Sequence, residues 1–125
     1  MTGFAVLASV ILAQAPIVAA THQPVEPADK DVAYAELAAG MPAAAEARIE
    51  ANRSLDARDP ARLINLGAAY AAQGRTAQAE AMFKAAILSD RQYELELADG
   101  RWVDSRAAAR MALAELKRGD RLATR

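Results

Sequence analysis

The sequence contains no cysteine, one histidine and few aromatic residues. Without cysteine the chain forms no disulfide, no thiolate metal site and no thiol nucleophile, and it lacks the lipidated cysteine of a bacterial lipoprotein. A single histidine gives neither a proton relay between two imidazoles nor a pair of imidazole metal ligands. These absences remove the side chains on which most catalytic and metal sites depend.

Other signs of chemistry are also missing from the sequence. There is no glycine-rich phosphate loop, and no serine stands in a nucleophile-elbow sequence. Carboxylates such as Glu46, Glu50 and Glu80 fall at helical spacings, with arginines near Glu46 and Glu50 as on a solvated helix face. The formal net charge is −1, and the aromatic residues do not interleave with basic ones, so nucleic-acid binding is not expected. We therefore expect a protein that is not an enzyme and holds no cofactor.

What the chain does contain is an internal repeat. Several residues recur at a spacing of 34 residues, which is the length of one helix–turn–helix unit in a known class of repeat proteins. The recurring pairs are Gly40 and Gly74, Ala45 and Ala79, Glu46 and Glu80, Ile49 and Phe83, and Asp56 and Asp90. The spacing predicts two units, at about 26–59 and 60–93.

The second unit carries the fuller pattern of small and large residues. Gly67 and Ala79 are small enough for two antiparallel helices to approach closely, while Tyr70 and Phe83 fill the space around them. The residues expected to pack the repeat are Leu63, Leu66, Gly67, Tyr70, Ala79, Phe83 and Ala86.

On these residues the chain resembles the tetratricopeptide repeat family, whose members bind other proteins. The resemblance is strongest over 60–93, with two departures: Leu63 occupies the first aromatic position and Arg91 the closing proline position. It implies a mainly α fold of antiparallel helix–turn–helix repeats, of about two units. The alternative is one good hairpin beside an alanine-rich helix that happens to fit the spacing.

The resemblance also implies a binding groove along the first helix of the second unit. By position, the groove residues are Ala61, Ile64, Asn65, Ala68, Ala71 and Ala72. Some members of the family clamp a terminal carboxylate there, and only Asn65 matches that pattern, so a shallow apolar groove for a hydrophobic peptide or helix is expected. Alternatively, the N-terminal segment or a second copy of the protein covers this face.

Local signals set the expected helix boundaries. A first helix is expected over 31–39, closed by Gly40, and a second from Pro42 to about residue 58. Asp59 followed by Pro60 predicts the start of the third helix. Gly74 is expected to end that helix, and Thr76 to cap the fourth.

The pattern changes period after residue 92. Tyr93, Leu95 and Leu97 alternate with glutamates and precede Asp99 and Gly100, which predicts a β-hairpin over 92–104. A turn of two residues would place Leu97 opposite Trp102, with both side chains packed on the helices. The alternative continues a helix through 91–97. A terminal helix over 105–117 is expected next, capped by Asp104 or Ser105 and ended by Gly119, with a flexible tail over 119–125.

The N-terminus contains an apolar run without charge, over residues 4–20. Its length is typical of a secretory signal, and Val18, Ala19 and Ala20 precede a plausible cleavage point before Thr21. We therefore expect a signal peptide over 1–20, a linker over 21–28, and a helical domain over 29–118 in the periplasm or another exported location. The alternatives are an uncleaved membrane anchor and a buried N-terminal helix.

The only histidine, His22, lies in the expected linker. If cleavage fell after Ala19, histidine would stand third from a free amine, an arrangement that chelates copper or nickel; otherwise it is a solvated linker residue. The function expected from these patterns is a non-enzymatic scaffold or adaptor for another protein or peptide. The alternative is a structural or homo-oligomeric module of the cell envelope with no separate ligand.

Overall fold

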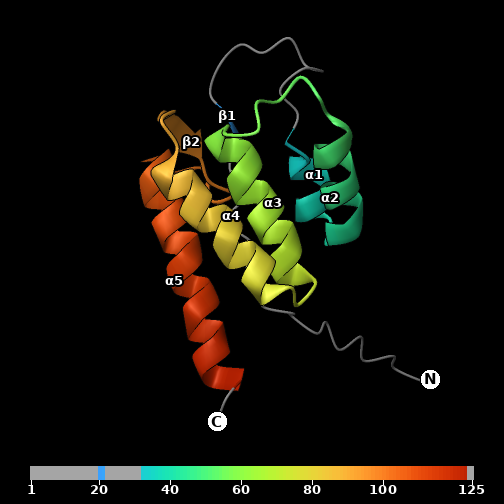
Figure 1. The fold of residues 1–125 in the computed structure, drawn as a ribbon, viewed down its shortest axis with the longest axis vertical. Helices are drawn as coiled ribbons and strands as arrows, with labels where there is room; N and C mark the ends of the chain where they lie inside the picture. Colours follow the sequence, from blue (N-terminus) through green and yellow to red (C-terminus); the bar gives the residue numbers. More distant parts are fainter. Residues whose placement is uncertain (1–19, 22–31, 124–125) are drawn as a thin grey trace, which may run out of the picture.

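The computed structural model describes residues 20–21 and 32–123, and it shows a mainly α protein (Figure 1). In chain order the described elements are β1 (Ala20–Thr21), α1 (Tyr34–Ala38), α2 (Pro42–Ala51), α3 (Pro60–Ala72), α4 (Thr76–Leu88), β2 (Glu94–Glu96), β3 (Trp102–Asp104) and α5 (Ser105–Ala123). Helices α3, α4 and α5 run side by side, and α1 and α2 lie on the other side of α3 (Figure 1). The expected helical fold with a short hairpin and a terminal helix is confirmed.

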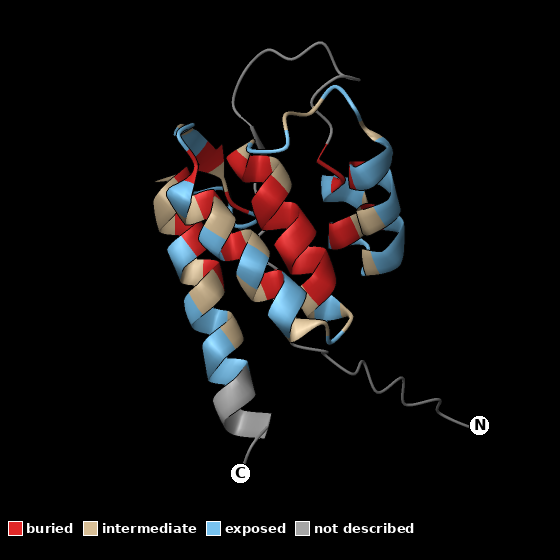
Figure 2. Ribbon diagram, in the orientation of Figure 1, coloured by how far each residue is buried: buried red, intermediate tan, exposed pale blue. Residues whose placement is uncertain are grey.

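Helix α3 is the central element of the core. It starts as predicted, with Pro60 in its first turn and the Asp59 carboxylate accepting a hydrogen bond of 3.0 Å from the backbone N–H of Arg62. Every residue from 63 to 70 is buried, which makes this helix almost uniformly red in Figure 2. A helix buried on all sides needs neighbours on all sides, and α2, α4 and α5 supply them.

The closest helix contact joins α3 and α4. Gly67 faces the Phe83 ring so tightly that a Cβ added at position 67 would lie 2.5 Å from Phe83 Cε1. The residues expected to pack the repeat are all buried: Leu63, Leu66, Gly67, Tyr70, Ala79, Phe83 and Ala86. The absence of a side chain at Gly67 therefore sets the distance between the two helices.

The first helical pair differs from the expected boundaries. Helix α1 starts at Tyr34 instead of residue 31, because Ala33 adopts a left-handed conformation (φ 59°) that a helix cannot contain. Helix α2 ends at Ala51 instead of residue 58, because the Asn52 side chain accepts a hydrogen bond from the backbone N–H of Ser54 and forms a turn. The loop between α2 and α3 is correspondingly longer than predicted.

The glycines that end helices behave as predicted, but one predicted cap is wrong. Gly40 and Gly74 both adopt positive φ, at 70° and 74°, in the position that follows the C-cap residues of α1 and α3. Thr76 is the first residue of α4 and not its cap; Arg75 occupies the cap position and provides no capping side-chain hydrogen bond.

The hairpin is present, but its register differs by one residue from the prediction. Gly100 adopts φ 83° in a three-residue loop, and the Leu97 N–H donates to the Arg101 carbonyl. Trp102 therefore pairs with Glu96 and not with Leu97, and the expected burial of Trp102 is wrong: it is 37% exposed. Leu95, which pairs with Val103, is the fully buried residue of the hairpin.

A third strand completes the sheet in the order β1-β2-β3. Ala20 lies opposite Glu96 and Thr21 opposite Leu95, in antiparallel pairing. The sequence predicted no strand here, since Ala20 belongs to the expected signal peptide and Thr21 to the expected linker. The rest of both segments, including His22, lies outside the described residues.

Helix α5 packs mainly against α4, at the edge of the layer formed by α3, α4 and α5 (Figure 1). Its cap is Asp104, whose carboxylate accepts hydrogen bonds from the backbone N–H groups of Arg106 and Ala107. The helix continues to Ala123, so Gly119 does not end it and the expected tail is helical over 119–123. A single glycine in a helix costs only about 1 kcal/mol, which the rest of a long helix offsets.

The two helical glycines give opposite predictions for substitution by alanine. Gly67→Ala places a methyl group inside the Phe83 ring contact, so it should destabilise the protein by about 1–3 kcal/mol. Gly119→Ala meets no atom within 4 Å and should stabilise α5 by a few tenths to about 1 kcal/mol. Urea denaturation of both variants measures the difference. Equal midpoints would contradict the packing role of Gly67.

Candidate functional site

The expected groove residues lie along α3, but most of them are not accessible. Ala61, Ile64 and Asn65 are fully buried and Ala68 is 7% exposed, while Ala71 is half-buried and only Ala72 is exposed. The expectation of an open, shallow groove at these positions is therefore wrong for the chain in this state. The face is covered because other parts of the protein pack against α3.

The residue that covers Asn65 comes from the chain itself. The Asn65 side-chain Nδ2 donates a hydrogen bond of 2.9 Å to the main-chain carbonyl of Val32, 33 residues earlier. Val32 is 5% exposed and its neighbour Ala33 is fully buried. A buried amide requires a hydrogen-bond partner, and here a backbone oxygen provides it. The sequence analysis expected Val32 and Ala33 inside the first helix; the alternative that it left open, covering of this face by the N-terminal segment, concerns residues that lie mostly outside the described part of the chain.

The backbone next to this contact is strained. Ala33 has φ 59° and ψ 37°, and it is the one described residue other than glycine with positive φ. The left-handed conformation costs an L-amino acid with a Cβ about 1–2 kcal/mol. Such strain persists only where surrounding contacts enforce it, and it often occurs at ligand sites and switch regions. Val32 and Ala33 were not selected from the sequence, because no local pattern marks them.

A polar cluster joins α2 to the turn between α3 and α4. The Glu46 carboxylate accepts hydrogen bonds from Gln73 Nε2 (2.9 Å) and from Arg75 Nη1 (2.8 Å). These hydrogen bonds, first that of Gln73 and then that of Arg75, lower the pKa of Glu46. The Arg75 guanidinium also lies 4.4 Å from the centroid of the Tyr70 ring. The cluster therefore fixes the first helical pair against the second.

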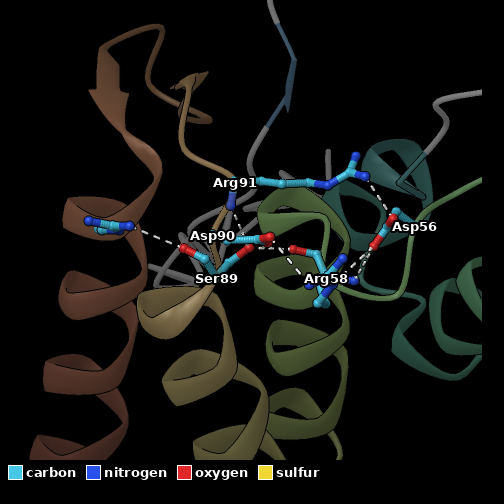
Figure 3. A network of polar contacts seen from close by, with 6 residues as sticks. Asp56, Arg58, Ser89, Asp90 and Arg91 are labelled. Atoms are coloured by element: carbon cyan, nitrogen blue, oxygen red, sulfur yellow. Dashed lines mark hydrogen bonds and ion pairs between the residues drawn. The ribbon is translucent and has the colours of Figure 1, made fainter.

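A second polar network joins the two loops that follow α2 and α4 (Figure 3). Arg91 pairs with Asp56 at 2.8 Å, and Arg58 pairs with Asp90 at 3.2 Å. The Ser89 hydroxyl donates to the Arg58 carbonyl and accepts from the backbone N–H of Arg91. The backbone N–H of Arg58 is the main cause of a lowered pKa at Asp56. Since Asp56 and Asp90 are equivalent in the repeat, the network links equivalent ends of the two units.

A further polar contact joins Tyr93 to the residue that caps α3. The Tyr93 hydroxyl donates to Asp59 at 2.7 Å, and burial, followed by this hydrogen bond, raises the pKa of Tyr93. A phenol that keeps its proton is a poor nucleophile. Within residues 20–21 and 32–123, no three histidine, aspartate or glutamate side chains are grouped to hold a metal ion. The arginines and carboxylates of the two networks pair with one another.

No helix in the described part of the chain is both long enough and apolar enough to cross a membrane.

The Glu46 cluster gives a testable pH dependence. A carboxylate with a lowered pKa stabilises the fold above its unfolded pKa of about 4.3, and this stabilisation is lost as pH falls through the folded value. Glu46→Gln should therefore lower the thermal midpoint at pH 7 and flatten its dependence on pH below about 4.5. Glu115→Gln, at an exposed position of α5, serves as a control. A pH profile unchanged in Glu46→Gln would contradict this assignment.

Comparison with known protein families, with curated proteins and with solved structures finds no significant match to this chain. The resemblance to tetratricopeptide repeats therefore rests on the spacing and identity of the repeat residues. A function must be argued from the surface of this molecule itself, since a helical fold is compatible with many functions.

Proposed function

We propose that this protein is a non-enzymatic scaffold that binds an extended segment of another protein along α3. The observation that carries the proposal is the hydrogen bond from Asn65 to the Val32 carbonyl. An amide on a helix face that binds a main-chain oxygen recognises an extended backbone, whatever side chains that backbone carries. The Val32 contact supports this reading because it is an example of such binding within the chain.

The residues around Asn65 indicate the chemistry of the partner. Ala61, Ile64 and Ala68 form an apolar row with mostly small side chains, which other residues of the chain cover in this structure. Small side chains let a bound backbone come close to the helix, and the apolar surface favours a hydrophobic segment over a charged one. Ala72, at the C-terminal end of the row, is exposed to solvent. A hydrophobic peptide that lies along α3 would therefore first contact the helix near this end.

The alternative function, a structural or homo-oligomeric module, has one observation in its favour. Tyr34, at the start of α1, and Met41, just before α2, are 40% and 54% exposed, and a second copy has this apolar surface to bury. Mass measurement in solution separates the two functions. A monomer whose mass does not change with concentration supports the scaffold, and a stable dimer supports the structural module.

We also propose that the chain is exported, on the basis of the uncharged run over 4–20 and the small residues before Thr21. The predicted outcome is a mature protein that starts at Thr21, which intact-mass spectrometry of the protein from its native cell detects. An intact N-terminus in a soluble cytoplasmic fraction would contradict export.

Site-directed photocross-linking tests the binding face. A photoreactive residue at position 72, at the exposed end of the row, should form covalent adducts with partner proteins in living cells. The same residue at position 43, which is exposed on α2, is the matched control and should form few or none. Equal adduct patterns from both positions would show that α3 has no special role. Adducts only with a second copy would favour the homo-oligomeric alternative.

A further inference from the structure

We propose that the outer face of α5 is a docking surface for a membrane with anionic lipid headgroups. The cations of this face are Arg106, Arg110, Lys117 and Arg118. The proposal is independent of partner binding along α3, because it concerns a different helix. Three observations support it: the direction in which the face points, the unpaired positive charge on it, and the absence of large exposed apolar side chains from it.

The packing of α5 fixes the direction in which this face points. The side of the helix that contacts the core consists of small buried residues: Ser105, Ala108, Ala109 and Ala112. A helix turns by about 100° per residue, so Arg110, Ala114 and Lys117 lie on the opposite side. All three are exposed, as is Arg118. Because α5 lies at the edge of the helical layer, its outer face is turned away from the rest of the protein (Figure 1).

The cations on this face differ from most other exposed arginines of the protein, because they are unpaired. Within the described part of the chain, Arg110, Lys117 and Arg118 form neither a hydrogen bond nor an ion pair. Between residues 106 and 118 the sequence holds a single carboxylate, Glu115, and it pairs with none of them. Elsewhere, carboxylates bind most of the exposed arginines: Arg48, Arg58, Arg91 and Arg101. The outer face of α5 therefore carries a surplus of positive charge.

The stability of α5 does not account for this surplus. The helix dipole favours cations only within the last turn, and α5 continues well past Lys117. Arg110 follows Arg106 by one turn, a spacing at which like charges repel. On the neighbouring helix, the Glu80 carboxylate forms its ion pair with Lys84, whose hydrogen bond is the main cause of its lowered pKa, and the charge of Lys117 adds little. An anionic partner from outside the chain would compensate the positive charge.

This face matches a membrane better than a folded protein partner. Four large apolar side chains are exposed in the described residues: Tyr34, Met41, Leu88 and Trp102. None of them belongs to α5, although a protein partner gains most of its affinity from such anchors in complementary pockets. An anionic membrane attracts basic residues without complementary shape. The residues between the cations include Ala107, Met111 and Ala114, which are apolar and suit a helix that lies among the headgroups.

A fluorescent label on α5 tests the contact directly. Because the chain has no cysteine, Ala114→Cys introduces a single site for an NBD fluorophore at the centre of the face. The labelled full chain is mixed with vesicles of phosphatidylcholine, either alone or with added anionic phosphatidylglycerol. NBD emission should shift to the blue only with the anionic vesicles, and added salt should reverse the shift. Ala43→Cys, exposed on α2, is the matched control and should show no shift.

Charge variants identify the residues responsible. A triple variant that removes the unpaired cations should weaken the vesicle affinity reported by the label at least about tenfold, because each cation near an anionic surface contributes to binding. Its substitutions are Arg110→Gln, Lys117→Gln and Arg118→Gln. The matched control removes the same charge from exposed positions near α2 and should keep the affinity within about twofold. Its substitutions are Arg48→Gln, Arg53→Gln and Arg58→Gln.

Each outcome decides for or against the membrane contact. A blue shift at position 114 that needs phosphatidylglycerol and is lost only in the α5 triple variant supports it. The absence of a shift, or an equal shift with phosphatidylcholine alone, would overturn it. A shift with polyglutamate but not with anionic vesicles would also overturn it, and would assign the face to an acidic protein. The proposed function is judged separately, since cross-links from position 72 report on α3 and not on α5.

Discussion

The contact between Gly67 and Phe83 is the constraint on which the rest of this structure depends. The missing side chain at Gly67 lets α3 and α4 approach until the aromatic ring lies against the backbone of α3. This approach puts α3 at the centre of the molecule, where α2 and α5 also pack on it. Because the core is rich in alanine, its few large side chains supply most of the buried apolar area, and each of them matters more than in an average domain. The buried position of Asn65 follows from the same packing.

The charged residues have a different role from this core. Arg58 and Arg91 have side chains that are 65% and 50% exposed, so their ion pairs with Asp90 and Asp56 are screened by water, and such pairs typically contribute about 0–1 kcal/mol. Each of these ion pairs connects the loop of one helical unit to the loop of the other. Helix packing holds the protein together, and the paired charges connect the loops of the two units.

The parts of the fold that the sequence predicted are those with local causes. The third helix starts at Asp59 and Pro60 because a cap and a fixed proline φ act within one turn, and Gly67 was identified because its spacing from Phe83 follows the repeat. The errors involve distant partners. Ala33 stands at the repeat position of Gly67, yet it lies outside any helix, where the preceding carbonyl meets Asn65. The row on α3 was identified by its position in the tetratricopeptide pattern, and Val32 and Ala33 were missed as the residues that cover it because they were expected inside the first helix.

The short strand β1 bears on whether cleavage of the proposed leader comes before or after folding of the sheet. It pairs residues 20 and 21 with residues 96 and 95, so it forms only after residues 95 and 96 have been synthesised. The bond between Ala20 and Thr21 lies within this strand, and a peptidase needs such a bond unpaired and extended in its own cleft. If the chain is exported as proposed, removal of the leader competes in time with closure of the sheet. Fast translocation keeps the bond open to cleavage, whereas a chain that folds first protects it.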